Sequence, residues 1–339
     1  MALFKNETVS SLADFVSKLN TFLTTDTPAW EPDRHVPGSG EWAVSKDDGS
    51  GRSVEVAFQW DVATPNALGV YQYRSGSGAG NYNTGVAPYA QANDSGNGAA
   101  STSDAVLVTS RHVEITNTPV QYWAFAGSTY VNVAVQISAT EYRFFGFGVE
   151  EKFNDWTGGE YAYGWKYGLS SGVAQGAGSS MLLDGLLNGS GTEVFAATMH
   201  IEGLSNQPTS GLYGVHMGNQ GSGSLGNDRQ GTPRGRGHLS GGFRAGSHAV
   251  GFGQFSGTLI QGHVASYPLV TYYWDRVSND IFPLGAMKDV RGILLRNFAA
   301  QDTVTISGDT WWIFPSRSRW ASGSFSGTTG YQGIMFKQN

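Results

Sequence analysis

Tyr142-Arg-Phe-Phe-Gly-Phe-Gly-Val-Glu-Glu-Lys-Phe-Asn-Asp-Trp-Thr-Gly-Gly-Glu-Tyr-Ala-Tyr-Gly-Trp165 is the stretch of the chain that decides the fold. It combines aromatic residues with glycines and contains almost no aliphatic side chains. Aromatic rings supply large and rigid contact areas, and glycines let two backbones approach closely. This combination predicts a packed contact surface rather than an active site.

The composition of the whole chain favours β structure. The 339 residues are 40% hydrophobic and 13% aromatic, but only 14% are charged and 48 are glycine. Soluble domains usually contain about 25% charged residues, and a chain rich in glycine forms helices poorly. We therefore expect a mainly β protein with a β-sandwich-like body, long Gly-rich loops and one N-terminal α-helix.

The low charge content has a second implication, which concerns assembly. Surfaces that are buried against other subunits do not need charge for solubility. A protein that works inside an oligomer would have this composition, but so would a monomer covered by Ser, Thr, Asn and Gln. The composition alone leaves both interpretations open.

The net charge of −6 and the pI near 5.6 argue against a broad nucleic-acid-binding face. The local exception is the Gly-rich segment 229–244, where Arg234, Arg236 and Arg244 lie close together in the sequence. This segment is either a solvated loop or a surface that contacts an acidic neighbouring subunit.

Several classes of protein are excluded or disfavoured. The chain has no cysteine, which excludes disulfides and thiolate metal sites. Its first residues do not combine a charged leader with an apolar core, so we expect no Sec-type signal peptide. No run of 18 apolar residues occurs, so we expect no contact with a membrane.

One amphipathic helix is predicted over residues 7–23. Apolar residues such as Leu12 and Phe15 recur there at three- and four-residue spacing, and Thr8 or Ser10 could cap the start. A single helix of this length is marginally stable alone. We therefore expect residues 1–29 to form a helical arm that docks through Leu12 and Phe15 on the β body or on another subunit.

The rest of the chain, residues 30–339, is predicted to be a β-rich body, either as one unit or as two subdomains divided near residues 165–190. Residues 41–60 have the pattern of a hairpin with a turn at 47–51, and residues 105–150 have that of a meander. The Gly- and Ser-rich segments 75–104 and 218–247 are expected to be contact loops, because long inserts without regular structure usually serve a function.

Four carboxylates cluster beside aromatic residues in the deciding stretch: Glu150, Glu151, Asp155 and Glu160. Paired carboxylates flanked by aromatic rings are typical of glycoside hydrolases, but an acidic turn beside a tryptophan gives the same pattern. No second catalytic signature supports the enzyme, and the seven histidines form neither an HxH nor an HExxH motif. We therefore predict no catalytic residue, no metal site and no cofactor.

The aromatic residues that follow are the strongest functional signal. Tyr161, Tyr163 and Trp165 alternate, which places them on one face of a strand, and Trp156 lies just before them. Such a row is compatible with ordinary core packing, with a protein–protein contact or with stacking on a sugar.

Two motifs carry a family resemblance. Residues 142–148 followed by 155–164 resemble the central block of virion structural proteins of tailed bacteriophages. The ending, with Trp312-Ile-Phe-Pro and then residues 326–337, is similar to the C-termini of these proteins. The N-terminal helix followed by Pro28-Ala-Trp30 also fits.

The resemblance implies a structural component of the phage particle, in the tail, baseplate or head–tail region, that is made in the cytoplasm of the bacterial host. Its expected partners are other virion proteins and copies of itself, with neither nucleic acid nor membrane. The alternatives are a glycan-binding module for adsorption to the host surface and, third, a glycosidase-like enzyme.

Overall fold

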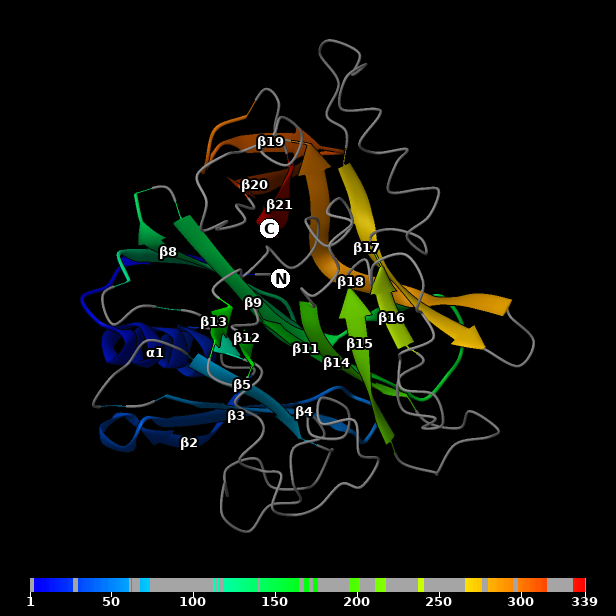
Figure 1. Ribbon diagram of the computed structural model, residues 1–339, viewed down its shortest axis with the longest axis horizontal. Helices are drawn as coiled ribbons and strands as arrows, with labels where there is room; N and C mark the ends of the chain where they lie inside the picture. Colours follow the sequence, from blue (N-terminus) through cyan, green and yellow to red (C-terminus); the bar gives the residue numbers. More distant parts are fainter. Residues whose placement is uncertain are drawn as a thin grey trace.

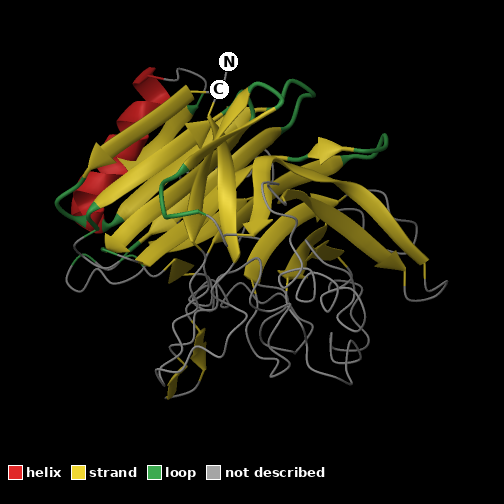
Figure 2. Cartoon of the chain, turned by 90° about the horizontal axis from the view of Figure 1, so that it is seen from above, coloured by secondary structure: helices red, strands yellow, loops and turns green. Residues whose placement is uncertain are grey.

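The computed structural model of the chain describes residues 3–26, 30–60, 62, 68–73, 112–113, 115, 119–139, 141–164, 168–170, 173–175, 195–201, 211–217, 237–240, 266–275, 280–294, 298–315 and 332–338. These residues form two seven-stranded sheets, one five-stranded sheet and a two-stranded ribbon, all antiparallel, beside one α-helix (Figures 1 and 2). The predicted mainly β, sandwich-like fold is therefore confirmed.

The sheets form three layers. Figure 1 shows the central sheet, largely green, between a blue N-terminal sheet and a C-terminal sheet that runs from yellow to red. In spatial order, the strands of the central sheet are β1 (Leu3–Thr8), β7 (Gln121–Ala126), β8 (Tyr130–Ser138), β9 (Glu141–Val149), β11 (Gly158–Gly164), β14 (Phe195–Ile201) and β15 (Gly211–Met217).

The two outer sheets differ in how the spatial order of their strands follows the sequence. The N-terminal sheet takes its strands in sequence order: β2 (Glu31–Val36), β3 (Glu41–Asp47), β4 (Ser53–Gln59), β5 (Leu68–Tyr73) and β6 (His112–Val113). The C-terminal sheet has the order β16 (Gly237–Ser240), β17 (Ser266–Asp275), β18 (Asp280–Leu294), β21 (Gln332–Gln338), β20 (Asp309–Pro315) and β19 (Thr303–Ile306), and β10 (Glu151–Lys152) also pairs with β18. The ribbon consists of β12 (Gly168–Ser170) and β13 (Val173–Gln175).

Strand β9 explains why residues 144–149 of the deciding stretch are aromatic, aliphatic or glycine. Phe144 lies toward the C-terminal sheet, with its ring centre 6.2 Å from that of Phe314. Its neighbour Phe145 lies toward the other side, with its ring centre 5.8 Å from that of Phe58 in the N-terminal sheet. Consecutive residues of a strand point to opposite faces, so a strand buried on both faces reads as a continuous apolar run.

The predicted hairpin and meander are confirmed within the described residues. Strands β3 and β4 pair from Glu41 with Gln59 to Asp47 with Ser53, as residues 41–60 predict. Strands β7, β8 and β9 follow one another as neighbours in the central sheet. Most of residues 105–118 of the meander, the segment 75–104, most of 218–247 and most of the predicted subdomain boundary lie outside the described residues. Within 218–247 the loop prediction is wrong for Gly237–Ser240, which form strand β16 and pair with β17.

The N-terminal helix differs from its predicted limits. Helix α1 spans Leu12–Thr21, and the chain continues through a π-helical turn, η1, over Phe22–Asp26. The predicted start at residue 7 is wrong, because residues 3–8 form strand β1 and pair with β7. The cap is neither Thr8 nor Ser10: the Ser11 hydroxyl accepts a hydrogen bond from the Asp14 amide at 3.0 Å, which satisfies an N–H that has no partner within the helix.

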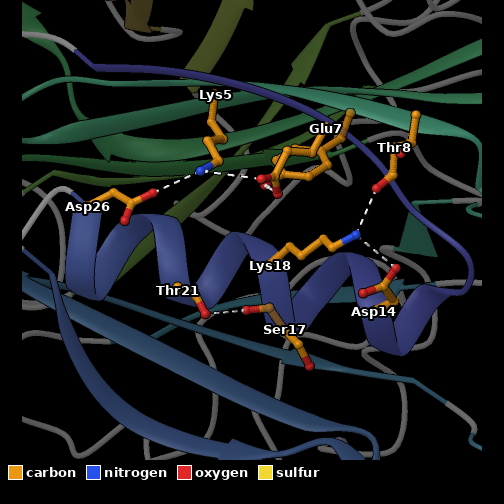
Figure 3. A network of polar contacts seen from close by, with 9 residues as sticks. Lys5, Glu7, Thr8, Asp14, Ser17, Lys18, Thr21 and Asp26 are labelled. Atoms are coloured by element: carbon orange, nitrogen blue, oxygen red, sulfur yellow. Dashed lines mark hydrogen bonds and ion pairs between the residues drawn. The ribbon is translucent and has the colours of Figure 1, made fainter.

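Helix α1 packs into the common core through one face. Leu12, Phe15, Val16 and Leu19 are fully buried among residues of the central and N-terminal sheets. At its polar side, Lys18 donates to the Thr8 carbonyl at 2.8 Å and pairs with Asp14, while Lys5 of β1 pairs with Asp26 at 3.0 Å (Figure 3). Strand β1 and the helix are thus joined by both apolar and ionic contacts.

Short 3₁₀ geometry links the first two strands of the N-terminal sheet. Residues Pro37–Ser39 form η2, and Gly40 follows with a φ of +67°. A Cβ at Gly40 would lie 2.0 Å from the Trp60 carbonyl oxygen. Only glycine allows the chain to turn this close to the end of β4.

Candidate functional site: the acidic and aromatic junction between the sheets

The segment with the four carboxylates is a junction between two sheets. After β9 the chain leaves the central sheet and forms β10, in which Glu151 pairs with Ala286 and Lys152 with Gly285 of the C-terminal sheet. It then returns to the central sheet as β11, beside β9. We refer to residues 150–160 as the junction segment.

The Leu284 carbonyl fixes the turn of the junction segment. It accepts a hydrogen bond from the Phe153 amide at 2.9 Å and another from the indole nitrogen of Trp156 at 3.1 Å. The Lys152 ammonium donates to the Trp156 carbonyl at 3.0 Å and lies 5.1 Å from the centre of the indole ring, within the range of a cation–π contact. The polar end of Trp156 is therefore engaged inside the protein, whereas Phe153 is 50% exposed.

The two buried carboxylates of the cluster are held by different sheets. Glu160 is 2% exposed and forms an ion pair with Arg52 at 2.5 Å, and Arg52 lies in the turn between β3 and β4. Glu150 is 3% exposed, and a Cβ added at Gly285 would lie 2.8 Å from its carboxyl carbon. Glu160 and Arg52 connect the N-terminal sheet to the central one. Removing either partner would leave a charge without its counterion in a largely buried site.

Glu151 and Asp155, by contrast, are exposed. The four carboxylates that are close in sequence are thus divided between a buried pair and an exposed pair. Retaining and inverting glycosidases need two carboxyl groups that face one substrate. Glu150 and Glu160 are almost completely covered within the chain, with 3% and 2% of their surfaces exposed.

A second set of polar contacts joins the central sheet to β18. The Tyr130 hydroxyl donates to the Asp289 carboxylate, and the Asn132 side-chain amide donates to the Lys288 carbonyl at 3.2 Å. Asp289 has a φ of +55°, a left-handed conformation that aspartate tolerates better than most residues. Burial and then the contact with Asp289 raise the pKa of Tyr130, so its hydroxyl remains a hydrogen-bond donor.

Tyr161 occupies the interior of the same region. Its side chain is fully buried, and burial, followed by the nearby charges of Glu150 and Asp289, raises its pKa. The phenol is therefore neutral near neutral pH. Tyr161 therefore contributes packing to the junction.

The chain itself covers three of the predicted contact residues. Leu12, Phe15 and Tyr161 are 0% exposed, so the chain itself covers them and they do not form a surface for a partner. The physical reason is that the central sheet is buried on both faces, and aromatic and aliphatic residues on either face pack internally. Of the docking alternatives for α1, the structure shows the one on the β body.

The remaining predicted contact residues have different positions. Trp156 is partly exposed at the edge of the junction segment. Tyr163 lies in β11, opposite Gly146 of β9 and Ala197 of β14, and its side chain is not described. Trp165, Arg234, Arg236 and Arg244 lie outside the described residues.

Arg52, Tyr130 and Asp289 also form contacts between the sheets, although no sequence pattern predicts them. Arg52 is 108 residues from Glu160, and Tyr130 is 159 residues from Asp289. Neither pair has a local sequence signal. Only the stacking of the three sheets brings these side chains together.

The described part of the chain offers neither a cluster of metal-ligating side chains nor a membrane-spanning helix. No three His, Asp or Glu side chains there are grouped so that they could hold a metal ion. Within the same residues, no helix has the length and apolar character needed to cross a bilayer.

Comparison with known proteins gives no assignment. No protein-family model matches the chain, and no curated protein has a matching sequence. The resemblance to phage virion proteins therefore stays a prediction.

Proposed function

We propose that this chain is a structural subunit of a tailed-phage particle, in the tail, baseplate or head–tail region, and that it acts through contacts with copies of itself and with other virion proteins. The proposal combines the resemblance of residues 142–164 and 312–337 to virion proteins with a charged fraction of only 14%. Low charge is compatible with surfaces that become buried in an assembly.

The observation that carries the proposal is the construction of the junction segment. The residues with the strongest potential for chemistry connect three sheets: Glu160 pairs with Arg52 of the N-terminal sheet, and residues 151–152 pair with β18 of the C-terminal sheet. Such cross-links favour a rigid block, which is what a particle subunit requires. They do not favour an open cleft for substrate.

The first test asks whether the chain is part of a particle. Particles purified from the source culture should contain it in an amount comparable with known structural proteins, as measured by quantitative mass spectrometry. The matched measurement is the unassembled protein fraction of the same lysate. A chain that is abundant in the free fraction and missing from the particles would refute the proposal.

The second test separates assembly from glycan binding and hydrolysis. Hydrogen exchange should show increased protection of residues 75–104 and 218–247 in particles relative to the isolated subunit, because segments that contact a neighbour become shielded. Binding of soluble host oligosaccharide without such a change would favour the adsorption module. Cleavage of glycan that is lost in Glu160→Gln would favour the glycosidase.

A further inference from the structure

Strand β1 forms an edge of the central sheet. Within the described residues, its six residues pair with β7 alone, in continuous register from Leu3 with Ala126 to Thr8 with Gln121. An edge strand presents backbone N–H and C=O groups that can pair with another chain. Natural proteins usually protect such edges against unwanted pairing.

The other edge of the central sheet, β15, lies beside β16 of the C-terminal sheet (Figure 1). The remaining edges of the described sheets are protected or short. Strand β2 contains Pro32 and an irregular register between Glu31 and Arg34; both features interrupt pairing. Strands β6 and β19 have two and four residues. Strand β1 has neither proline nor a bulge.

The protection of β1 is instead electrostatic. Lys5 and Glu7 are spaced two residues apart and therefore lie on one face of the strand, where they form an ion pair at 3.3 Å and stay 32% and 35% exposed. A charge on an edge strand disfavours pairing with most chains, because it would face an apolar or like-charged residue. It permits pairing with a strand that carries the opposite charge at the matching position.

A second copy of β1 is such a strand. When two copies of Leu3–Thr8 run antiparallel with Asn6 opposite Asn6 of the other copy, Lys5 stands opposite Glu7, and Phe4 stands opposite Thr8. The two-fold axis through Asn6 generates the Lys–Glu pair twice. Because this axis is perpendicular to the sheet, paired side chains lie on the same face. Opposite charges at paired positions stabilise a sheet, and like charges destabilise it.

Contacts with other parts of the chain hold β1 in place. Phe4 stacks on Trp312 of β20, with ring centres 5.3 Å apart and an angle of 20° between the planes, and it also contacts Phe125. On the open side of β1, the Thr8 carbonyl already accepts a hydrogen bond from Lys18 of α1, so pairing with a second copy centres on the backbone of Asn6. Asn6, at the centre of the matched register, is exposed and accepts a hydrogen bond from the half-buried side chain of Gln121.

We infer that the β1 edge is a self-association surface, on which a second copy of this chain pairs antiparallel about Asn6. The central sheets of the two copies would then become one continuous sheet. This inference goes beyond the proposed function and does not depend on it, because it follows from the edge and its charges alone.

The absence of cysteine gives a direct test. Asn6→Cys places one thiol in each copy at the two-fold axis, where paired strands bring Cα atoms about 4.5–5.5 Å apart, within disulfide range. Mild oxidation should link this variant into a dimer. Ser50→Cys, at the exposed tip of the β3–β4 hairpin, is the matched control and should stay unlinked under the same conditions.

Charge exchange tests the register. Lys5→Glu places a glutamate opposite Glu7 and should shift the protein toward monomer in analytical ultracentrifugation. The double variant Lys5→Glu/Glu7→Lys restores the pair between copies, although it does not restore the internal pair with Asp26, and it should recover the dimer. A wild-type protein that is monomeric at all concentrations, or a dimer that Lys5→Glu leaves unchanged, would overturn the inference.

The two proposals fail separately. A chain found in particles whose Asn6→Cys variant does not cross-link would refute only the pairing of β1. A chain that dimerises through β1 but is missing from particles would refute only the structural role in the virion.

Discussion

Replacing Phe144 and Phe145 one at a time is the sharpest test of the three-layer fold. Phe144 is 2% exposed and contacts Phe314 and Phe336 of the C-terminal sheet, whereas Phe145 is 0% exposed and contacts Phe15 and Phe58 on the opposite side. In a two-layer sandwich one of two adjacent residues would face water. Here both are in the core, so both substitutions should be costly.

The magnitude follows from burial. Removing a fully buried phenylalanine loses the transfer free energy of the ring and leaves a cavity, together about 3–5 kcal/mol for Phe→Ala. We expect Phe144→Ala and Phe145→Ala each to lower the free energy of unfolding by this amount. Urea denaturation followed by tryptophan fluorescence would measure it, and the slope of the transition would show whether unfolding remains cooperative.

The chain contains its own control for this experiment. Phe153 lies in the junction segment and is 50% exposed, so Phe153→Ala removes the same atoms with little loss of burial. Its effect should stay below about 1 kcal/mol. If either Phe144→Ala or Phe145→Ala is as mild as Phe153→Ala, that residue is not buried between two sheets and the reasoning fails.

Three further substitutions test local features, each by the change in unfolding midpoint. Ser11→Ala should cost about 1 kcal/mol, because the amide of Asp14 loses its cap; no change would mean that another residue caps α1. Gly148→Ala should destabilise by about 1–3 kcal/mol, since its φ is +152° and a Cβ would lie 2.5 Å from the Thr129 carbonyl oxygen, whereas Gly38→Ala, with open space around it, should be near neutral. Partial burial disfavours the charge of Asp14, but hydrogen bonds from the preceding turn and from Lys18 outweigh it and lower its pKa. The resulting stabilisation is complete above the unfolded pKa of about 3.9 and is lost as the pH falls through the lower folded value, so Asp14→Asn should lose less stability on acidification than the wild type; equal losses would contradict this assignment.

The sequence predicts the class of fold because local patterns determine it. The meander pattern of residues 105–150 and the turn residues at 47–51 give strands β8, β3 and β4 within a few residues. The aromatic run at 142–148 predicts dense packing. It does not reveal that the packing is on both faces, because a short apolar run looks the same in a two-layer and a three-layer protein.

The ends of helix α1 and the contacts between the sheets are less predictable from the sequence, for different reasons. Glu7 and Thr8 fit a helical start as well as a strand end, and the choice is made by pairing with β7, which is over a hundred residues away in sequence. Arg52 and Glu160 meet only after the sheets have stacked. Long-range pairing of this kind depends on tertiary packing, which overrides local propensity.

The burial of the central sheet restricts where a partner can bind. Both faces of β9 are occupied by the chain's own side chains, Phe314 and Phe336 on one side and Phe15 and Phe58 on the other. A sheet covered on both faces can extend only at its edges, and β1 is an edge with matched charges. Substitutions in the core should therefore change the free energy of unfolding and leave association unaffected in the protein that still folds, whereas Lys5→Glu should change association far more than stability, because its internal ion pairs are surface pairs of small energy. A dimer that is lost in Phe153→Ala but retained in Lys5→Glu would place the contact at the junction segment instead of at β1.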